Sequence, residues 1–190
     1  MKAPTTQIYS GSLDINSATL SVLQVVTAAL VVGLCAHIKI PLFFTPIPLS
    51  MQTLAILLTG AFLGSRKGAA SMLLYLSLGF MGLPLFVGGP ASLGYLAGPS
   101  GGYLLGFVAQ AYLAGLLVER KVASNKFSLF VAFLGCCAVQ LGMGVFWLAQ
   151  FTGWDAVLAL GLYPFIAGEA LKSLVTATIV RLKTAEPVSG

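Results

Sequence analysis

Two ionisable residues, Glu169 and Lys172, lie in the otherwise uncharged stretch of residues 164–180. A spacing of three residues places both side chains on the same face of a helix. A carboxylate accepts N–H groups from a ligand, and an ammonium donates to a carbonyl oxygen or pairs with an anion. The pair therefore indicates either a polar binding site or a structural ion pair that fixes helix packing. We favour the binding site, because buried ion pairs stabilise a fold poorly compared with apolar packing.

Further polar and aromatic residues near one end of the predicted helices could add contacts to a ligand. Gln52 lies just below a Pro-rich loop, where it could bind a ligand or cap a helix. Aromatic residues are enriched at both membrane interfaces, so anchoring is the simpler role for Tyr95, Tyr103 and Trp154. Two more polar residues, which could line a pocket or join helices, are Gln140 and Gln150.

Motifs for catalysis or metal binding are absent from the sequence. It has no G-x-x-x-x-G-K-[ST] phosphate loop, no H-E-x-x-H and no G-x-S-x-G. The three cysteines, Cys35, Cys136 and Cys137, have no metal-ligand spacing and are expected to pack as small apolar residues. We therefore predict a protein that is not an enzyme and has no cofactor or metal. The alternative of another class is a membrane enzyme that uses Glu169 and Lys172 as an acid–base pair.

Composition identifies lipid as the main solvent of the chain. Of its 190 residues, 58% are hydrophobic and 8% charged, and the mean hydropathy is +0.97. Soluble domains carry charge on roughly a quarter of their residues. The chain is therefore predicted to be an all-α integral membrane protein.

Six stretches have the apolar length that membrane helices need, or nearly so. A helix that spans a bilayer takes roughly 20 apolar residues. The predicted spans are residues 18–38, 49–64, 68–83, 100–118, 127–150 and 164–182. A tight basic turn at 64–68 joins the two shorter spans, and a short segment at 155–162 precedes the last. The predicted organisation is a segment at 1–17, a membrane domain at 18–183 and a tail at 184–190.

Basic residues set the orientation of this bundle. With both termini in the cytoplasm, the inner segments hold eight of the ten basic residues, while the outer loops hold only Lys39 and the last helix holds Lys172. Cytoplasmic loops are enriched in Lys and Arg. We therefore predict a multi-pass protein of the cytoplasmic (inner) membrane with both termini cytoplasmic. The net charge of +5 follows from this topology and does not indicate nucleic-acid binding.

Two outer loops and one helix face are candidates for function. The loop at 39–49 is apolar and Pro-rich, and the loop at 84–99 is uncharged and rich in Gly and Pro, so both are predicted to fold over the mouth of the bundle or to be ordinary packing loops. Ser100 is expected to cap the following helix. Ala29 and Gly33 form a small-residue face that serves packing within the bundle or contact with a partner subunit.

Four stretches together resemble one transporter family. They are IPLFFTPIPLSMQTLAILLTGAFLGSRKG at 40–68, LLYLSLGFMGLPLFVGG at 73–89, LAGPSGGYLLGF at 96–107 and YPFIAGEALKSL at 163–174. In their order and spacing they are similar to the biotin-binding S components (BioY family) of energy-coupling factor transporters. Position 169 is Glu where the family usually has Asp, and position 100 is Ser where Thr is usual; both keep the functional group.

The resemblance implies a six-transmembrane-helix bundle of S-component type for high-affinity biotin capture and uptake. It implies a pocket open to the outside and roofed by the first outer loop, and assembly with a membrane T component and two cytoplasmic ATPases, the T component meeting Ala29 and Gly33. On this hypothesis Glu169 accepts a ureido N–H, and Lys172 donates to the ureido oxygen or to the carboxylate. The residues expected to close around the rest of biotin are Gln52, Phe86, Gly89, Tyr95 and Tyr103. The alternatives are an S component for thiamine or riboflavin, or a partner subunit without a ligand.

Overall fold

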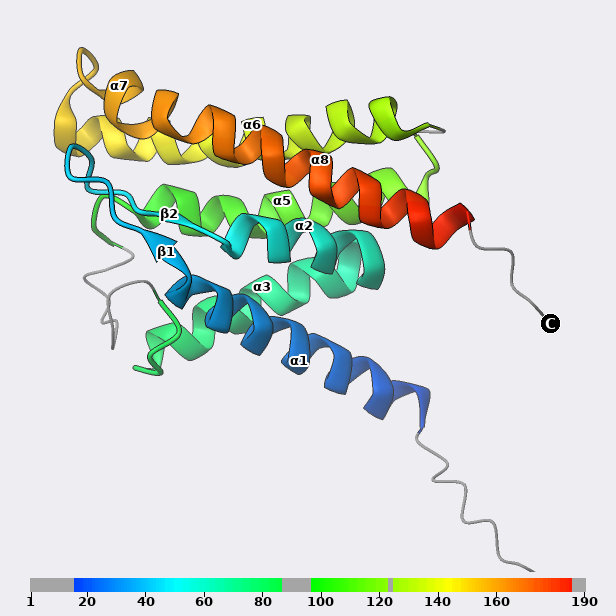
Figure 1. Cartoon of the computed structure of the whole chain (residues 1–190). Coiled ribbons are helices and arrows are strands. Elements are labelled where there is room, and N and C mark those ends of the chain that lie inside the picture. The colour runs from blue at the N-terminus through cyan, green and yellow to red at the C-terminus, as the bar shows by residue number, and fades with distance from the viewer. Residues whose placement is uncertain (1–15, 87–96, 123–124, 186–190) are drawn as a thin grey trace, which may run out of the picture.

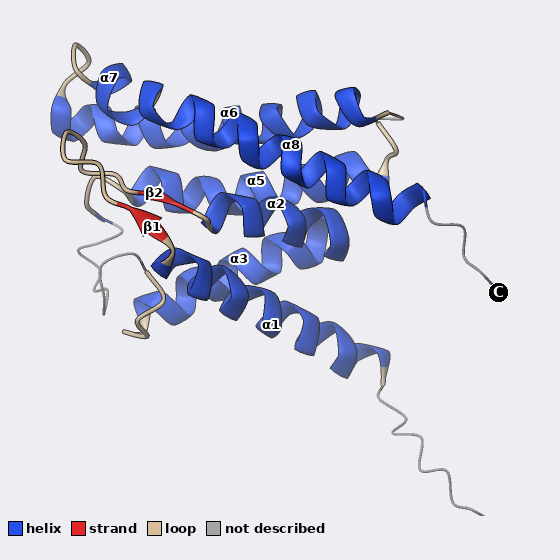
Figure 2. Ribbon diagram, in the orientation of Figure 1, coloured by secondary structure: helices blue, strands red, loops and turns tan. Residues whose placement is uncertain are grey.

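The computed structural model describes residues 16–86, 97–122 and 125–185, and within them the chain is almost entirely helical (Figure 1, Figure 2). The elements are α1 (Ser17–His37), β1 (Lys39–Ile40), β2 (Leu49–Ser50), α2 (Gln52–Leu63), α3 (Ser65–Phe80), α5 (Gly101–Glu119), α6 (Lys126–Thr152), α7 (Val157–Gly161) and α8 (Tyr163–Ala185). The predicted all-α bundle of six long helices is confirmed, and α7 matches the predicted short segment before the last span.

The long helices lie side by side with alternating directions (Figure 1). One end of the bundle holds the start of α1, the α2–α3 turn, the α5–α6 link and the end of α8. The opposite end holds the two strands and α7. Helix α5 packs against α2, α3 and α6, so it forms the centre of the bundle.

Helix length and surface chemistry both fit a membrane environment. Helices α1, α5 and α6 are long and apolar enough to cross a bilayer, as is the segment Val157–Lys183 that contains α7 and most of α8. Large apolar side chains face outward, with Leu34 69% exposed and Phe146 67% exposed. Helices α2 and α3 are shorter, at 12 and 16 residues. That this pair reaches full membrane depth with the help of adjoining backbone stays a prediction.

Helix starts are fixed by side-chain caps at two places. The Asn16 side chain accepts the Ala18 N–H, and the Asn125 side chain accepts the Ser128 N–H at 2.8 Å. Ser100 occupies the N-cap position of α5, but its side chain makes no capping hydrogen bond. The predicted cap at Ser100 is therefore wrong in its chemistry, although the helix begins where it was expected.

Helices α2 and α3 meet at a single residue, not at a five-residue turn. Gly64 adopts a φ of 86°, which glycine tolerates, and α3 begins directly at Ser65. Arg66 and Lys67 therefore belong to the first turn of α3. The Glu119 carboxylate, at the end of α5, accepts both the N–H and the hydroxyl of Ser65 at 2.7 Å. This contact satisfies a donor at the start of α3 and fixes the hairpin against the central helix.

The first outer loop, residues 41–48, connects the two strands of a small antiparallel ladder that the sequence did not predict. Its Thr45 hydroxyl donates to the Leu160 carbonyl oxygen at 2.6 Å, which holds the loop against α7. Ile47 is buried as expected for a loop folded over the bundle, whereas Phe43 is fully exposed. The prediction that the apolar loop residues fold inward therefore holds for only part of the loop.

Helices α5 and α6 approach each other closely where Gly144 of α6 packs against the Tyr103 ring of α5. A Cβ atom added at Gly144 would collide with the ring of Tyr103, which is 5% exposed. We expect Gly144→Val to destabilise the protein by about 1–3 kcal/mol, because the enlarged side chain must displace this ring. The measurement is thermal unfolding of the purified protein in detergent.

The matched control is Gly142→Val on the same helix, where an added Cβ meets nothing within 4 Å. This variant carries the same change in helix propensity without the collision. Equal melting temperatures for the two variants would contradict the packing assigned to Gly144.

Candidate functional site

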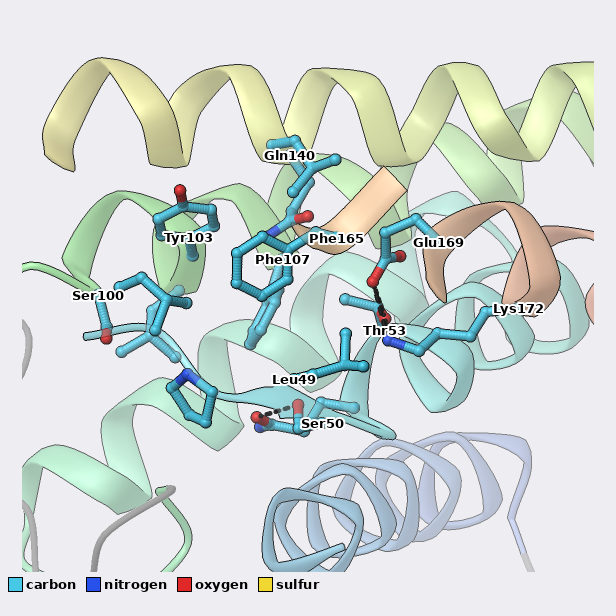
Figure 3. Close-up of a pocket in the computed structure, with 15 residues that line it drawn as sticks. Leu49, Ser50, Thr53, Ser100, Tyr103, Phe107, Gln140, Phe165, Glu169 and Lys172 are labelled. Carbon is cyan, nitrogen blue, oxygen red and sulfur yellow. Dashed lines mark hydrogen bonds and ion pairs between the residues drawn. The ribbon is translucent and has the colours of Figure 1, made fainter. Parts of the chain in front are cut away.

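The polar centre of the bundle is a cluster of Thr53, Glu169 and Lys172. The Lys172 ammonium donates to Glu169 Oε1 and to the Thr53 hydroxyl, both at 2.8 Å, and the same hydroxyl donates to Glu169 Oε1 at 2.8 Å (Figure 3). Glu169 and Lys172 are 3% and 7% exposed. The two charges neutralise each other within α8, and Thr53 joins them to the first turn of α2. A charge left unpaired at such depth would cost about 2.5–3.5 kcal/mol on insertion scales.

Part of the hydrogen-bonding capacity of this cluster is unused. Glu169 Oε2 is buried and makes no hydrogen bond within the described residues. The Cys137 thiol lies near this carboxylate, but a thiol is a weak donor, so Oε2 keeps its capacity to accept a stronger N–H donor. Lys172 carries three N–H groups and uses two of them in the cluster. The site can therefore accept at least one N–H and donate one more.

A cavity lies against this cluster at the end of the bundle that holds the strands and α7. Its lining residues come from the first outer loop, α2, α5, α6 and α8: Ile47, Pro48, Leu49, Ser50, Gln52, Thr53, Ser100, Tyr103, Leu104, Phe107, Gln140, Leu141, Phe165, Glu169 and Lys172. Apolar walls with a few convergent polar groups are typical of small-molecule sites.

The cavity is contracted in this structure. Its volume is about 50 Å³, within a cleft whose unfilled space is about 490 Å³ when the part open to solvent is counted. A cavity of about 50 Å³ is enough for water but not for an organic ligand. Residues 47–50, which line it, belong to the first outer loop and β2. The loop and β2 therefore cover the cavity on this side.

The structure brings four of the predicted site residues together at the cavity: Glu169, Lys172, Gln52 and Tyr103. The Gln52 amide donates to the Tyr75 hydroxyl at 2.7 Å and accepts from Ser50 at 3.2 Å, so it is held between α3 and β2. The Tyr103 hydroxyl donates to the Gly161 carbonyl oxygen at 2.7 Å. Tyr103 is thus a buried wall of the cavity, and interface anchoring is excluded for it.

Of the other predicted contacts, the structure describes only Phe86. Phe86 is 1% exposed in the apolar core, edge-to-face with Tyr75 at 5.3 Å, and it is not part of the cavity lining. Gly89 and Tyr95 lie outside the described residues. Of the two helix glutamines, Gln140 lines the cavity whereas Gln150 is exposed on the outside of α6. Sequence reasoning had no means to separate these two.

Several lining residues were not predicted. Thr53 had a usable signal, because a hydroxyl beside Gln52 begins an otherwise apolar helix. Phe107 and Phe165 had none, since an aromatic residue in an apolar helix gives no sign of facing a cavity rather than lipid or core. No group of His, Cys, Asp and Glu that could hold a metal ion occurs within residues 16–86, 97–122 and 125–185.

The small-residue face of α1 is packed inside the bundle. Ala29 is fully buried, and a Cβ added at Gly33 would lie 2.7 Å from Leu85 Cδ2. The structure therefore shows the packing role for this face. Contact of Ala29 and Gly33 with a partner subunit stays a prediction.

These features define a class: a multi-pass α-helical membrane protein with a small-molecule cavity between its helices. Residues 6–187 match the model of the BioY family. The chain belongs to the BioY family.

Relatives of known name agree with this assignment. The chain is 37% identical over 166 residues to the "Biotin transporter BioY" of Rhodobacter capsulatus, covering 81% of this chain and 87% of that protein. It is 36% identical over 167 residues to the "Biotin transporter BioY" of Thermotoga maritima, covering 84% and 92%. A solved structure, the "S-component for biotin from an ECF-type ABC transporter", superposes with a TM-score of 0.75 at 25% identity, covering 97% of this chain and 96% of that one.

The bridging role of Thr53 is testable by Thr53→Val, which keeps the shape of the side chain and removes its hydroxyl. We expect a loss of about 1–3 kcal/mol in stability, because Lys172 and Glu169 each lose a buried partner. Thermal unfolding in detergent measures the effect. Thr59→Val is the control, because Thr59 is buried in the same helix and no hydrogen bond of its hydroxyl occurs in the described part. A smaller loss for Thr53→Val than for Thr59→Val would rule out the bridge.

Proposed function

We propose that this protein captures biotin at the outer face of the cytoplasmic membrane and mediates its uptake as the S component of an energy-coupling factor transporter. The observation that carries the proposal is the buried Thr53–Glu169–Lys172 cluster with unused hydrogen-bonding groups at a cavity. Membership of the BioY family supplies the ligand class, since its members named above are biotin transporters.

The chemistry of the cavity fits this ligand. Biotin has an apolar bicyclic body, a ureido group with N–H donors and one oxygen, and a terminal carboxylate. Glu169 Oε2 is the acceptor for a ureido N–H, because its partner oxygen is already held by Lys172 and Thr53. The free N–H of Lys172 is available to the ureido oxygen or to the carboxylate. The Tyr103, Phe107 and Phe165 rings form apolar walls for the bicyclic body.

Energy for uptake comes from other subunits in this proposal. The sequence has no phosphate-binding loop, so a membrane T component and two cytoplasmic ATPases supply the coupling. This chain captures the ligand and the partners drive its release to the inside. The alternatives that experiments must separate from this one are another vitamin as ligand and a role without any ligand.

The orientation places the cavity toward the outside. The start of α3, the α5–α6 link and the end of α8 share one end of the bundle, and β1 lies at the opposite end (Figure 1). The first set holds Arg66, Lys67, Arg120, Lys121, Lys126, Arg181 and Lys183, whereas β1 holds Lys39. Because Lys and Arg are enriched on the cytoplasmic side, the cavity end faces outward. The segments that precede and follow the membrane domain at 18–183 in the sequence, residues 1–17 and 184–190, are then both cytoplasmic.

Biotin binding by the purified, detergent-solubilised protein tests the function and its site. We expect the parent protein to bind labelled biotin, and Lys172→Met and Glu169→Gln each to weaken binding by about 1.5–3 kcal/mol, roughly 10- to 150-fold, as for hydrogen bonds to charged groups. Isothermal titration measures the affinities. Lys183→Met serves as the control, because Lys183 is exposed and lies over the Phe62 ring at 4.4 Å, far along α8 from the cavity.

Each outcome of this experiment has a distinct meaning. A folded parent that does not bind biotin refutes the function, and a screen of thiamine and riboflavin then follows. A parent that binds biotin with both variants unaffected keeps the function and refutes this site.

Reporter fusions test the orientation. We expect a fluorescent protein at the C-terminus to be fluorescent and alkaline phosphatase at the same position to be inactive, because this end is cytoplasmic. A chain truncated after Lys39 and fused to the same reporters should give the opposite result. The reverse pattern in both fusions would invert the topology.

A further inference from the structure

One cavity residue has a buried amide that finds no hydrogen-bond partner among the described residues. Gln140 lines the cavity and is 2% exposed. Its Oε1 makes no hydrogen bond, and no bond of its amide nitrogen occurs in the part of the chain that the structure describes. In Figure 3 this side chain extends from α6 into the cavity, above Phe107 and on the same side as Glu169. An unsatisfied buried polar group costs about 1–3 kcal/mol, so Gln140 does not serve stability in the empty protein.

The helix contact beneath Gln140 limits where its amide can go. A Cβ added at Gly106 of α5 would lie 3.0–3.1 Å from the backbone and Cγ of Gln140. The α6 backbone is thus pressed against α5 at this level, and the base of the glutamine side chain is held there. The amide group beyond this contact is therefore the part of Gln140 that can reach the cavity.

A second buried glutamine shows the difference between a packing role and a cavity role. Gln110 is fully buried, and its amide nitrogen donates to Cys137 Sγ at 3.2 Å. Its Oε1 is also unsatisfied, but Gln110 is not among the cavity-lining residues. Gln110 therefore joins α5 to α6, whereas Gln140 makes no such link.

We propose that Gln140 is a specificity-determining residue whose Oε1 accepts one N–H of the cyclic urea of the ligand, while Glu169 Oε2 accepts the other. The inference rests on the proposed function. The cavity has two unsatisfied acceptor atoms, Glu169 Oε2 and Gln140 Oε1, and one unused N–H on Lys172. A cyclic urea has two N–H donors and one carbonyl oxygen, which correspond to these two acceptors and this one donor. Lys172 then donates to the ureido oxygen, not to the carboxylate.

The parent protein alone gives the first test, with biotin and its two mono-N-methyl isomers as ligands. Each methyl group removes one N–H and leaves one buried acceptor unsatisfied. We expect both isomers to bind more weakly than biotin in isothermal titration. An isomer that binds as well as biotin would show that this N–H has no acceptor in the protein, and the inference would be overturned.

The second test uses Gln140→Met, which keeps the length of the side chain and removes the acceptor. We expect its affinity for biotin to fall about three- to tenfold, as for loss of a neutral hydrogen bond. Its affinity for one N-methyl isomer should be unchanged, because that isomer lacks the N–H that Gln140 accepts. Gln110→Met is the matched control, with a lower melting temperature and parent-like affinity for all three ligands.

The outcomes separate the inference from the function beneath it. Unchanged biotin affinity in Gln140→Met, or equal weakening of all three ligands, overturns the role of Gln140 and leaves biotin capture standing. Absence of biotin binding by the parent overturns both.

Discussion

The structure depends on the need to neutralise two opposite charges inside an apolar bundle. Glu169 and Lys172 lie on one face of α8 and are almost fully buried. Pairing alone leaves their remaining hydrogen-bonding groups unsatisfied in a low-dielectric interior. Thr53 is the only described residue outside α8 that hydrogen-bonds the pair, at 2.8 Å to each member. The first turn of α2 is therefore fixed to α8 at this depth.

The position of α2 explains why a cavity exists above the cluster. Helix α2 has 12 residues and begins only at Gln52, further from the cavity end of the bundle than the start of α5 (Figure 1). Two short paired strands and an extended loop fill the remaining depth. Irregular backbone is tolerated at membrane depth only where protein covers it, and the Thr45–Leu160 hydrogen bond holds the loop against α7. The cavity is therefore covered by strand and loop, where the neighbouring helices have regular helical backbone.

Much of the fold could be predicted because lipid imposes a length on every apolar run. The six spans and the short segment before the last appear close to their predicted positions, and so does the pairing of α2 with α3. The β1–β2 ladder was missed because two-residue strands in a Pro-rich loop give no periodic signal. The turn at Gly64 was predicted too long, because the basic residues after it suggested a loop, whereas they begin α3.

The polar part of the site was predictable for a related reason, and the apolar part was not. A charged or amide residue inside a membrane helix must have a partner, so Glu169, Lys172 and Gln52 could be recognised from the sequence as candidate site residues. Phe107 and Phe165 could not be recognised in this way, because an apolar side chain packs equally well against lipid, core or ligand. Phe86 was assigned to the site from its place in a loop motif, yet its ring packs in the core against Tyr75. Only the helix rotations, which the tertiary packing sets, distinguish these cases.

The unsatisfied atoms of the cavity connect stability with recognition. A fully satisfied cluster would give a more stable empty protein but would leave a ligand only apolar contacts, and such contacts discriminate poorly between similar small molecules. Glu169 Oε2 and Gln140 Oε1 instead lack hydrogen-bond partners among the residues that the structure describes. A ligand with N–H groups in the right places relieves that penalty on binding, whereas an analogue without them leaves it in place. Selectivity for the ligand is thus obtained at the expense of stability in the empty state.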